Sequence, residues 1–515
     1  MFVGPLVYWW GGTGAAPPAT PSDKFTAKYL VGNSVAGDGT STSVAGFTYI
    51  LDPGDGSGIQ LALTQPSGFG DVYIRPGSYV APAPQVLTIP SGVRVTGAGR
   101  AATVLTGIGF ITNEASAIRD MTITVDTGIA VQGVAPSVNM EISDVLIELN
   151  GVATTGMYFE GSGSVTPPFD QLTSIDRVQV EITALGAFGL HANTGALLVF
   201  NELAINGGAE AVRAESDSAV FGSHGFFSGS SMAGIRILNG TGAALVRIEE
   251  CVVISTGTSV LLSGGVDACR FHNCFLIGVA AGINAVNCNL SNMACTGCTI
   301  TAERAVVGLA TFQSAQARFD ACNLNGYNGS CVDIGSLGSG ISFVDSSLQS
   351  NGSYALLSSS KVTASASTFT SDTGIACSLN GVGSNNMVGC SFVSFGSSPC
   401  VLEVTCPDNV FSGLFVMGPD AGAVASVRLS GSGSTFSSLS VTSLTLGVPS
   451  VIVSGRECTL STVRTITDVG QPGVIFDLTS TNNILLGLNA RGPGSSLLAV
   501  SDLGVTNEMA HIIGT

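Results

Sequence analysis

A six-residue pattern recurs about every 24 residues through most of the chain. It reads apolar, two variable positions, a small or apolar central residue, one variable position and a final apolar residue. Between Cys251 and Ser346 the central residue returns after 23, 24, 24 and 24 residues. A fixed period of about 20 to 50 residues is typical of a solenoid, in which one short unit stacks on the next. The central residues are Met121, Val145, Val178, Leu203, His224, Cys251, Cys274, Cys298, Cys322, Ser346, Ser367, Cys390, Leu414 and Leu439.

A second short apolar strand is predicted 8 to 12 residues after each central residue. Turns rich in Gly, Ser and Asn separate the strands, and no helical periodicity competes. Stacked coils of this kind pair every strand with its equivalents above and below, which predicts an all-β, right-handed parallel β-helix. About 15 to 18 coils at ~4.8 Å each would form a rod of roughly 70–85 Å. The second-strand markers are Ile129, Met157, Leu190, Val212, Ile235, Val260, Ile283, Val306, Val332, Leu356, Ile375 and Val401.

The chain carries few charges, and most of them are negative: charged residues make up 10%, and the net charge is −17. A chain of this charge cannot neutralise nucleic-acid phosphates and is repelled by an anionic membrane surface. We therefore expect no nucleic-acid partner and no membrane insertion, and no feature predicts a cofactor. So few charges on tightly stacked coils indicate that the side surfaces are partly covered. A homotrimer is the simplest cover.

The chain has 13 cysteines, and none comes before Cys251. Several fill the central position, which predicts a column of small buried thiols and not a disulfide framework. Cys295 and Cys298 have the spacing of a redox or zinc motif, but the repeat already places both in the core of one coil, so no metal site is predicted. Free thiols in this number indicate assembly in a reducing cytoplasm. The central cysteines are Cys251, Cys274, Cys298, Cys322 and Cys390.

The first 22 residues form a separate segment, in which an aromatic stretch precedes a Gly/Ala/Pro linker. The stretch lacks the basic n-region of a signal peptide and the ~20 apolar residues that span a bilayer. Aromatic side chains on a flexible tether are suited to docking in a groove of a partner, so we expect an anchor peptide. The alternative is a disordered or self-packed end. The anchor residues are Phe2, Val3, Leu6, Tyr8, Trp9 and Trp10.

Between residues 37 and 105 a short helix is predicted over Ile59–Gln65, then a strand over Asp71–Ile74 and the segment VRVTGAG over Val93–Gly99. This order resembles the start of the pectate-lyase-like β-helix superfamily, in which a capping helix (DGxAIQxAI) precedes a first coil (GGxVYLPPGxY). The resemblance implies a parallel β-helix and leaves the activity open, because the superfamily contains pectate lyases, polygalacturonases, bacteriophage tailspikes and non-enzymatic virion appendages. The matching residues are Gly56, Ile59, Gln60, Val72, Tyr73, Pro76, Gly77 and Tyr79.

The two variable positions inside each pattern are expected to lie at a bend and to face outward, and they are often acidic. Stacking would place successive carboxylates one or two strand spacings apart, near the ~5–9.5 Å used in glycoside hydrolysis, where like charges also raise one pKa. The alternative is a solvated edge without chemistry, because no Trp follows position 10. Arg177 is a possible lyase base, but no lyase motif surrounds it. His224 is expected to be a hydrogen-bonded core histidine. The catalytic candidates are Asp144, Asp176, Glu202 and Glu250.

These features predict a structural appendage on the surface of a tailed bacteriophage virion, a head decoration fibre or spike. Its N-terminus would bind a capsid or tail protein, its sides could contact host polysaccharide, and no enzymatic activity is expected. The alternative is a tailspike that binds or cleaves a host glycan, as a hydrolase or lyase, at the carboxylate stripe; a third possibility is a secreted pectate-lyase-like enzyme. The expected divisions are 1–22 (anchor and linker), 23–105 (cap and first coils), 106–445 (rod) and 446–515 (last coils and C-terminal cap).

Overall fold

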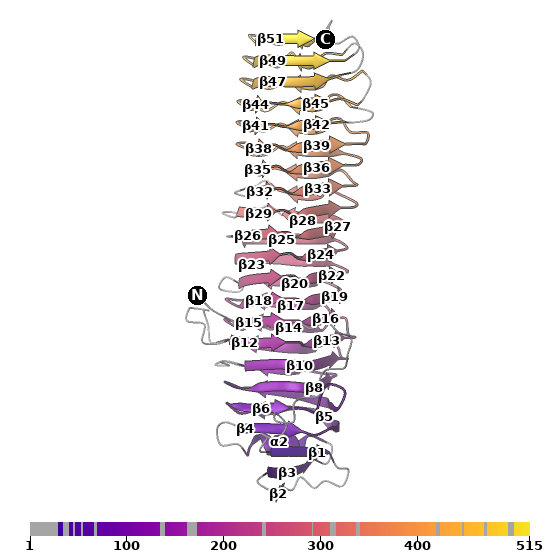
Figure 1. Cartoon of the computed structure of the whole chain (residues 1–515), viewed down its shortest axis with the longest axis vertical. Coiled ribbons are helices and arrows are strands. Elements are labelled where there is room, and N and C mark those ends of the chain that lie inside the picture. The colour runs from indigo at the N-terminus through magenta and orange to yellow at the C-terminus, as the bar shows by residue number, and fades with distance from the viewer. Residues whose placement is uncertain are drawn as a thin grey trace.

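The protein is a parallel β-helix of about 16 coils with about 24 residues per coil (Figure 1). The computed structural model describes residues 29–33, 41–44, 47–52, 55–65, 70–133, 140–161, 172–238, 244–290, 292–308, 316–335, 340–418, 423–444, 447–467, 471–492 and 499–514. The predicted fold is confirmed. The anchor segment, residues 1–22, lies outside the described residues, as do residues 162–171 in the long interval between Val145 and Val178.

Each coil contributes one strand to each of three parallel sheets. In one coil these are β14 (Phe188–Asn193), β15 (Leu197–Asn201) and β16 (Ala204–Gly207). They pair in parallel with β17 (Glu210–Glu215), β18 (Ala219–Ser223) and β19 (Phe226–Ser230) of the next coil. We call these the first, second and third sheets, in that order. Alternate side chains of every strand point inward, so the coils share one continuous core along the rod.

Phenylalanine rings stack within this core. Phe319, Phe343, Phe369 and Phe392 come from four successive coils, with ring centroids 5.5, 6.0 and 5.0 Å apart. All four are completely buried. Phe319 and Phe343 are equivalent residues of the second sheet, and Phe369 and Phe392 are equivalent residues of the third. Where one residue type repeats at one position, identical shapes pack on each other, which fixes the alignment of one coil over the next.

A single residue in the left-handed backbone conformation joins the second sheet to the third in each coil. These residues form what we call the bend column, with φ between +47° and +76°. The conformation costs an ordinary residue ~1 kcal/mol, yet most members are not glycine. The bend therefore turns the chain sharply without using one of the positions whose side chains form the core. The members are Asp120, Asp144, Arg177, Glu202, His224, Glu250, Asn273, Gly297, Ala321, Asp345, Ala366, Gly389, Gly413, Ser438, Thr462, Gly487 and His511.

The residue after each bend is the central residue of the sequence pattern, and in the middle coils its polar atom serves the backbone. The Cys322 N–H donates to Ser346 Oγ at 3.1 Å, and the Ser346 N–H donates to Ser367 Oγ at 3.2 Å. The Gly225 N–H likewise donates to Cys251 Sγ at 3.0 Å. The cysteine column is thus a ladder of acceptors as well as a stack of small buried groups. Twelve cysteines between Cys251 and Cys458 are free and buried.

Burial also keeps several of the thiols protonated. It raises the pKa of Cys251, Cys331 and Cys400 to about 12. A thiol reacts as its thiolate, so buried cysteines of this kind are chemically inert at neutral pH. Cys295 and Cys298 are both in the core, as the repeat predicted.

A second ladder, built from buried amides, runs through the C-terminal coils. Asn409 is completely buried; its Oδ1 accepts from Asn385 Nδ2 at 2.7 Å, and its Nδ2 donates to Ser434 Oγ at 2.9 Å. Further along, Asn483 Nδ2 donates to Asn507 Oδ1 at 3.1 Å. Each of these residues follows another left-handed position, a second bend that the sequence pattern did not reveal. These positions are Ser384, Asp408, Gly433, Glu457, Asn482 and Thr506.

The N-terminal end of the rod matches its sequence prediction closely. The helix α2 (Ser57–Leu63) begins two residues before the predicted start, and it buries Ile59, Ala62 and Leu63. Its N-cap residue is Gly56, and the Asp55 Oδ1 just before it accepts from the Ser57 N–H at 2.9 Å. The strands β4 (Gly70–Ile74) and β6 (Val93–Thr96) then pair in parallel and open the coils.

Two details of the predicted alignment are wrong. His224 is not a core residue: it belongs to the bend column, and 56% of its side chain is exposed. The chain shifts here because Gly222 takes the inward position and the Phe200 ring fills its space. In the first sheet, three markers are displaced by one or two residues. The residues in line are Val131 for Ile129, Cys377 for Ile375 and Leu402 for Val401.

The last described residues add a coil to the rod. The strands β50 (Val500–Asp502) and β51 (Glu508–Gly514) pair in parallel with β48 (Val474–Phe476) and β49 (Ile484–Arg491) of the coil before. Met509 and Ile512 stand in line with the buried Leu485 and Leu488, and they are 38% and 37% exposed. Among the described residues, no helix is long and apolar enough to cross a membrane.

Replacement of Asn409 by Ala is expected to lower the unfolding free energy by about 2 kcal/mol or more, because the Asn385 amide and the Ser434 hydroxyl lose a buried partner. Urea denaturation followed by circular dichroism measures the effect. Asn386→Ala is the matched control, since Asn386 is exposed one residue after the ladder. Equal midpoints for the two variants would refute the structural importance of the ladder.

Candidate functional site

The bend column carries a surface hollow over the coils that contain Asp120, Asp144 and Glu202. The hollow has a volume of about 530 Å³ and is open to solvent. Arg100 and Arg177 line it together with the three carboxylates. The bend makes this possible, because its left-handed residues project their side chains outward in every coil.

The Arg177 guanidinium forms most of the side-chain hydrogen bonds and ion pairs at the centre of this hollow. Its Nε and Nη2 each donate to one oxygen of Asp144 at 2.8 Å, a bidentate pair, and its Nη1 contacts the Asp176 carboxylate. Arg100 donates to the Arg177 backbone oxygen. The hydrogen bonds that Arg177 donates to Asp144 hold the pKa of Asp144 below its usual value, and the same hydrogen bonds raise the pKa of Arg177. Asp144 is therefore unsuited to act as a general acid.

Acidic and basic residues alternate along part of the bend column. Asp144, Arg177, Glu202, His224 and Glu250 come from five successive coils in that order. His224 Nε2 lies 2.8 Å from Glu250 Oε2. Arg177 therefore separates the carboxylates of Asp144 and Glu202, and the His224 imidazole separates those of Glu202 and Glu250.

The four catalytic candidates are brought to one edge of the rod but not to one site. Asp144 and Glu202 line the hollow, two coil spacings or ~10 Å apart along the rod. Asp176 lies one residue before the bend and accepts from Asn201 Nδ2 at 2.9 Å. Glu250 is two coils beyond Glu202 and pairs with His224. Of the four, only the Glu202 carboxylate accepts no hydrogen bond and forms no ion pair within the described part of the chain.

A second polar cluster, which the sequence analysis missed, lies on the first sheet. Its central row is Tyr158, His191, Arg213 and Arg236, which stand side by side on β11 (Thr155–Glu160), β14, β17 and β20 (Ala233–Leu238). These side chains point outward because their neighbours Met157, Leu190, Val212 and Ile235 fill the core. The bend column separates the other two sheets, so the row lies across the coil from the hollow.

Glu210 anchors the two arginines of this row. Its side chain is 1% exposed, with Oε1 2.6 Å from Arg236 Nη1 and Oε2 3.2 Å from Arg213 Nε. A buried carboxylate needs such pairing, since an isolated buried charge is very costly. Arg213 also lies 2.9 Å from Glu215 and stacks over the Phe188 ring at 4.9 Å. The guanidinium is thus fixed in the plane of the sheet face.

The aromatic end of the row is held in place as firmly. The rings of Tyr158 and His191 meet edge to face at 5.1 Å, and the Tyr158 hydroxyl accepts from Asn193 Nδ2 at 3.1 Å. His191 Nε2 lies 3.2 Å from Glu215. Burial lowers the pKa of His191 and raises that of Tyr158, so both are neutral at pH 7. We call Tyr158, Phe188, His191, Arg213 and Arg236 the aromatic–arginine row.

The row has hydrogen-bonding capacity left over. Arg236 Nε is buried and has no hydrogen-bond partner among the described residues. The contacts of Arg213 Nε and His191 Nε2 with carboxylates are close enough for ion pairs but not aligned as hydrogen bonds. Sequence alone could not reveal the row, because these residues are 22 to 33 positions apart and follow no motif; only alignment of the first-sheet strands shows that they share one column.

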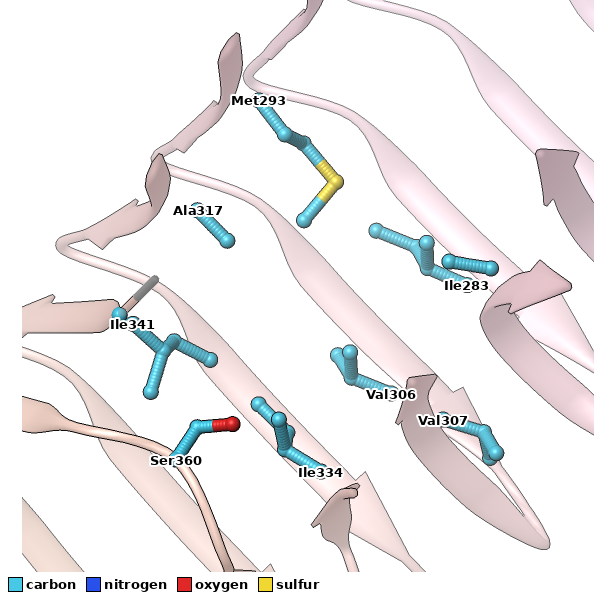
Figure 2. Close-up of a pocket in the computed structure, with 10 residues that line it drawn as sticks. Ile283, Met293, Val306, Val307, Ala317, Ile334, Ile341 and Ser360 are labelled. Atoms are coloured by element: carbon cyan, nitrogen blue, oxygen red, sulfur yellow. The ribbon is translucent and has the colours of Figure 1, made fainter. Parts of the chain in front are cut away.

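An apolar cavity also lies inside the rod, between the side chains of Ile283, Met293, Val306, Ala317 and Ile341 (Figure 2). The Ser360 hydroxyl at its edge donates to the Gly335 carbonyl at 2.6 Å. Among the residues that the structure describes, no other polar side chain lines it, so they offer nothing to orient a ligand and the cavity belongs to the core. The described residues contain no group of three or more His, Cys, Asp or Glu placed to hold a metal.

Known proteins resemble the chain in structure at very low identity. The A-module of the Azotobacter vinelandii mannuronan C-5 epimerase AlgE6 is 12% identical with a TM-score of 0.28, and 90% of this chain and 97% of that one are covered. A GH87 alpha-1,3-glucanase catalytic domain in complex with tetrasaccharides is 14% identical (TM-score 0.33; 85% and 67%). Tailspike protein 3 of bacteriophage CBA120 is 12% identical (TM-score 0.27; 95% and 62%). No protein-family model and no curated protein matches the chain.

Replacement of Arg177 by Gln is expected to raise the pKa of Asp144 toward its usual value, because the bidentate donor is lost. A carboxyl with a lowered folded pKa stabilises the protein above its unfolded pKa, and the gain disappears as pH falls through the folded value. Arg177→Gln should therefore destabilise the protein at about pH 7 and much less at about pH 2. Unfolding at both pH values measures this, with Arg464→Gln, exposed on the third sheet, as control. An equal loss at both pH values would exclude the pair as its cause.

Proposed function

We propose that the protein is a rod-shaped appendage of a tailed bacteriophage particle that binds a host-surface glycan through its aromatic–arginine row. The row supports this proposal because it combines partly exposed rings with fixed planar donors on the outward side of a sheet. A sugar ring offers C–H groups to an aromatic face and hydroxyls to guanidinium, imidazole and phenol groups. A straight row over four coils, ~14 Å long, would span about three sugar units of an extended chain.

The remaining parts of the proposal concern attachment and assembly. Phe2, Trp9 and the other aromatic and apolar residues of positions 1–10 would bind a capsid or tail protein, which places the rod on the virion surface. Three copies would associate in the mature particle, after assembly in the host cytoplasm. The inert, protonated thiols in the core suit a protein that folds in a reducing compartment.

Binding without cleavage is the form of the proposal that the bend column favours. Glycoside hydrolysis needs a carboxylic acid that keeps its proton and a second carboxylate about 5–9.5 Å away. Asp144 is held ionised by Arg177, and Asp176 is engaged by Arg177 and Asn201. Arg177 also separates Asp144 from Glu202 in the column. The bend column is therefore better suited to stabilising the coil edge than to acid–base chemistry.

Glycan binding is tested on the purified full chain with capsular polysaccharides and lipopolysaccharide glycans from candidate hosts. Tyr158→Ala and His191→Ala are each expected to weaken binding at least tenfold, because each removes a ring and a hydroxyl or imidazole partner. Tyr354→Ala, which removes a partly exposed tyrosine from the same sheet several coils away, should leave binding unchanged. Binding that survives both row variants, in proteins with unchanged circular dichroism, would rule out the row.

Glycan cleavage at the hollow is the second candidate function, since a volume of about 530 Å³ lined by three carboxylates and two arginines can admit a charged sugar. The same glycans are incubated with the protein, and released reducing ends and unsaturated products are measured. We expect none. Cleavage that disappears in Glu202→Gln or Asp176→Asn, while Tyr158→Ala retains it, would replace binding at the row with hydrolysis at the bend column.

A further inference from the structure

The outward face of the third sheet carries no charged side chain over eleven successive coils. The stretch runs from β16 to β45 (Ser440–Thr442), and every strand in it pairs in parallel with the next. Its outward residues are apolar or neutral and polar. They are Ala204, Asn206, Phe226, Ser228, Val252, Ile254, Phe275, Ile277, Thr299, Thr301, Asn323, Asn325, Ser347, Gln349, Thr368, Thr370, Ser391, Val393, Phe415, Met417, Ser440 and Thr442. We call this the neutral face.

Large apolar side chains gather at one end of the neutral face. Phe226, Ile254, Phe275 and Ile277 are 43%, 37%, 53% and 40% exposed. They come from three adjacent strands, β19, β22 (Val252–Ser255) and β24 (Phe275–Gly278), and Val252 lies between the two phenylalanines. Single exposed apolar residues are ordinary, but a contiguous group on a flat sheet marks a contact surface.

The net charge of the chain indicates which kind of partner this face can bind. Two copies with a net charge of −17 repel each other wherever their acidic surfaces meet. The neutral face is free of that repulsion, while Glu250 at the bend and Glu303 beyond the third sheet stand at its margins. A neutral centre with a charged rim is the usual anatomy of a protein interface. A partner that binds through charges of opposite sign would have no charged side chain to pair with on this face.

The dimensions of the face also fit a second rod. Eleven strands at ~4.8 Å spacing make a straight strip ~48 Å long, and four residues at ~3.3 Å make it ~13 Å wide. One copy would bury roughly 600 Å², near the ~800 Å² per partner of a standard interface. A strip that is long, straight and narrow matches an identical strip on a parallel rod, and it can contact two other copies around a three-fold axis.

We propose that the neutral face is the surface through which copies of this chain associate side by side, with the apolar group of Phe226, Val252, Ile254, Phe275 and Ile277 at the centre of the contact. This rests on the homotrimer of the proposed function and gives it an interface. It leaves the first sheet, with its aromatic–arginine row, facing outward on every copy.

The mass of the full chain in solution tests this interface. Sedimentation velocity at micromolar concentrations should give three times the chain mass of 51.8 kDa for the unaltered protein. Phe275→Glu, which places a carboxylate in the contact of each copy, should reduce the mass threefold. Val410→Glu is the matched control: Val410 is 54% exposed, against 53% for Phe275, and lies on the second sheet, so its variant should remain a trimer.

A cross-linking measurement keeps the test valid if Phe275→Glu fails to fold. Ile277→Cys adds a surface thiol to a protein in which twelve of the cysteines are buried. Mild oxidation should link copies of Ile277→Cys into a disulfide dimer on a non-reducing gel, and it should leave Val410→Cys unlinked. Glycan binding by the Phe275→Glu monomer, measured per site, should be unchanged, which separates this proposal from that of the aromatic–arginine row.

Three results would overturn the inference. They are a monomeric unaltered chain at tens of micromolar, a Phe275→Glu variant that remains trimeric, and equal cross-linking at positions 277 and 410. A trimer that persists in Phe275→Glu would locate the contact on another face. Loss of glycan binding with an intact trimer would instead contradict the proposed function alone.

Discussion

The parallel hydrogen-bonded pairing of each coil with the next is the constraint on which the whole structure depends. A single coil has no core of its own, so its apolar residues are buried only by the coils above and below. Equivalent residues must therefore stand in columns. The phenylalanine stack, the cysteine and serine ladder and the asparagine ladder are three chemical solutions to one requirement. The side chain at a given position must pack on, or hydrogen-bond to, the equivalent residue one coil away.

This constraint explains why so much of the fold could be predicted from sequence. A column leaves a periodic trace, and Cys251, Cys274, Cys298 and Cys322 displayed it at intervals of 23 and 24 residues. The prediction failed where a column position holds no side chain. At Gly222 the Phe200 ring fills the gap, so the pattern continued through half-buried Phe221 and exposed Phe226 and placed His224 in the core. The second bend, formed by residues from Ser384 to Thr506, could not be predicted because these residues share a backbone conformation and not a residue type.

Much less of the candidate site could be predicted, and the reason is also physical. Outward positions are not constrained by stacking, so their residue types carry no period. The acidic bend positions were visible because each precedes a central residue, and sequence placed Asp144, Glu202 and Glu250 at the bend. It could not foresee that Arg177 and His224 would stand between them and change their chemistry. The row from Tyr158 to Arg236 depends on loops of unequal length that bring distant residues into line.

The bend column accepts Asp, Arg, Glu, His, Asn, Ala, Ser, Thr and Gly in the same backbone conformation. A coil therefore has no required partner sequence on its outer edge, and one coil can be inserted or lost without disturbing those beyond it. The reach of the rod is adjustable in steps of ~4.8 Å, each corresponding to an in-frame gain or loss of about 24 codons. Length and surface chemistry can then evolve separately, because the number of coils sets the first and the outward residues alone set the second.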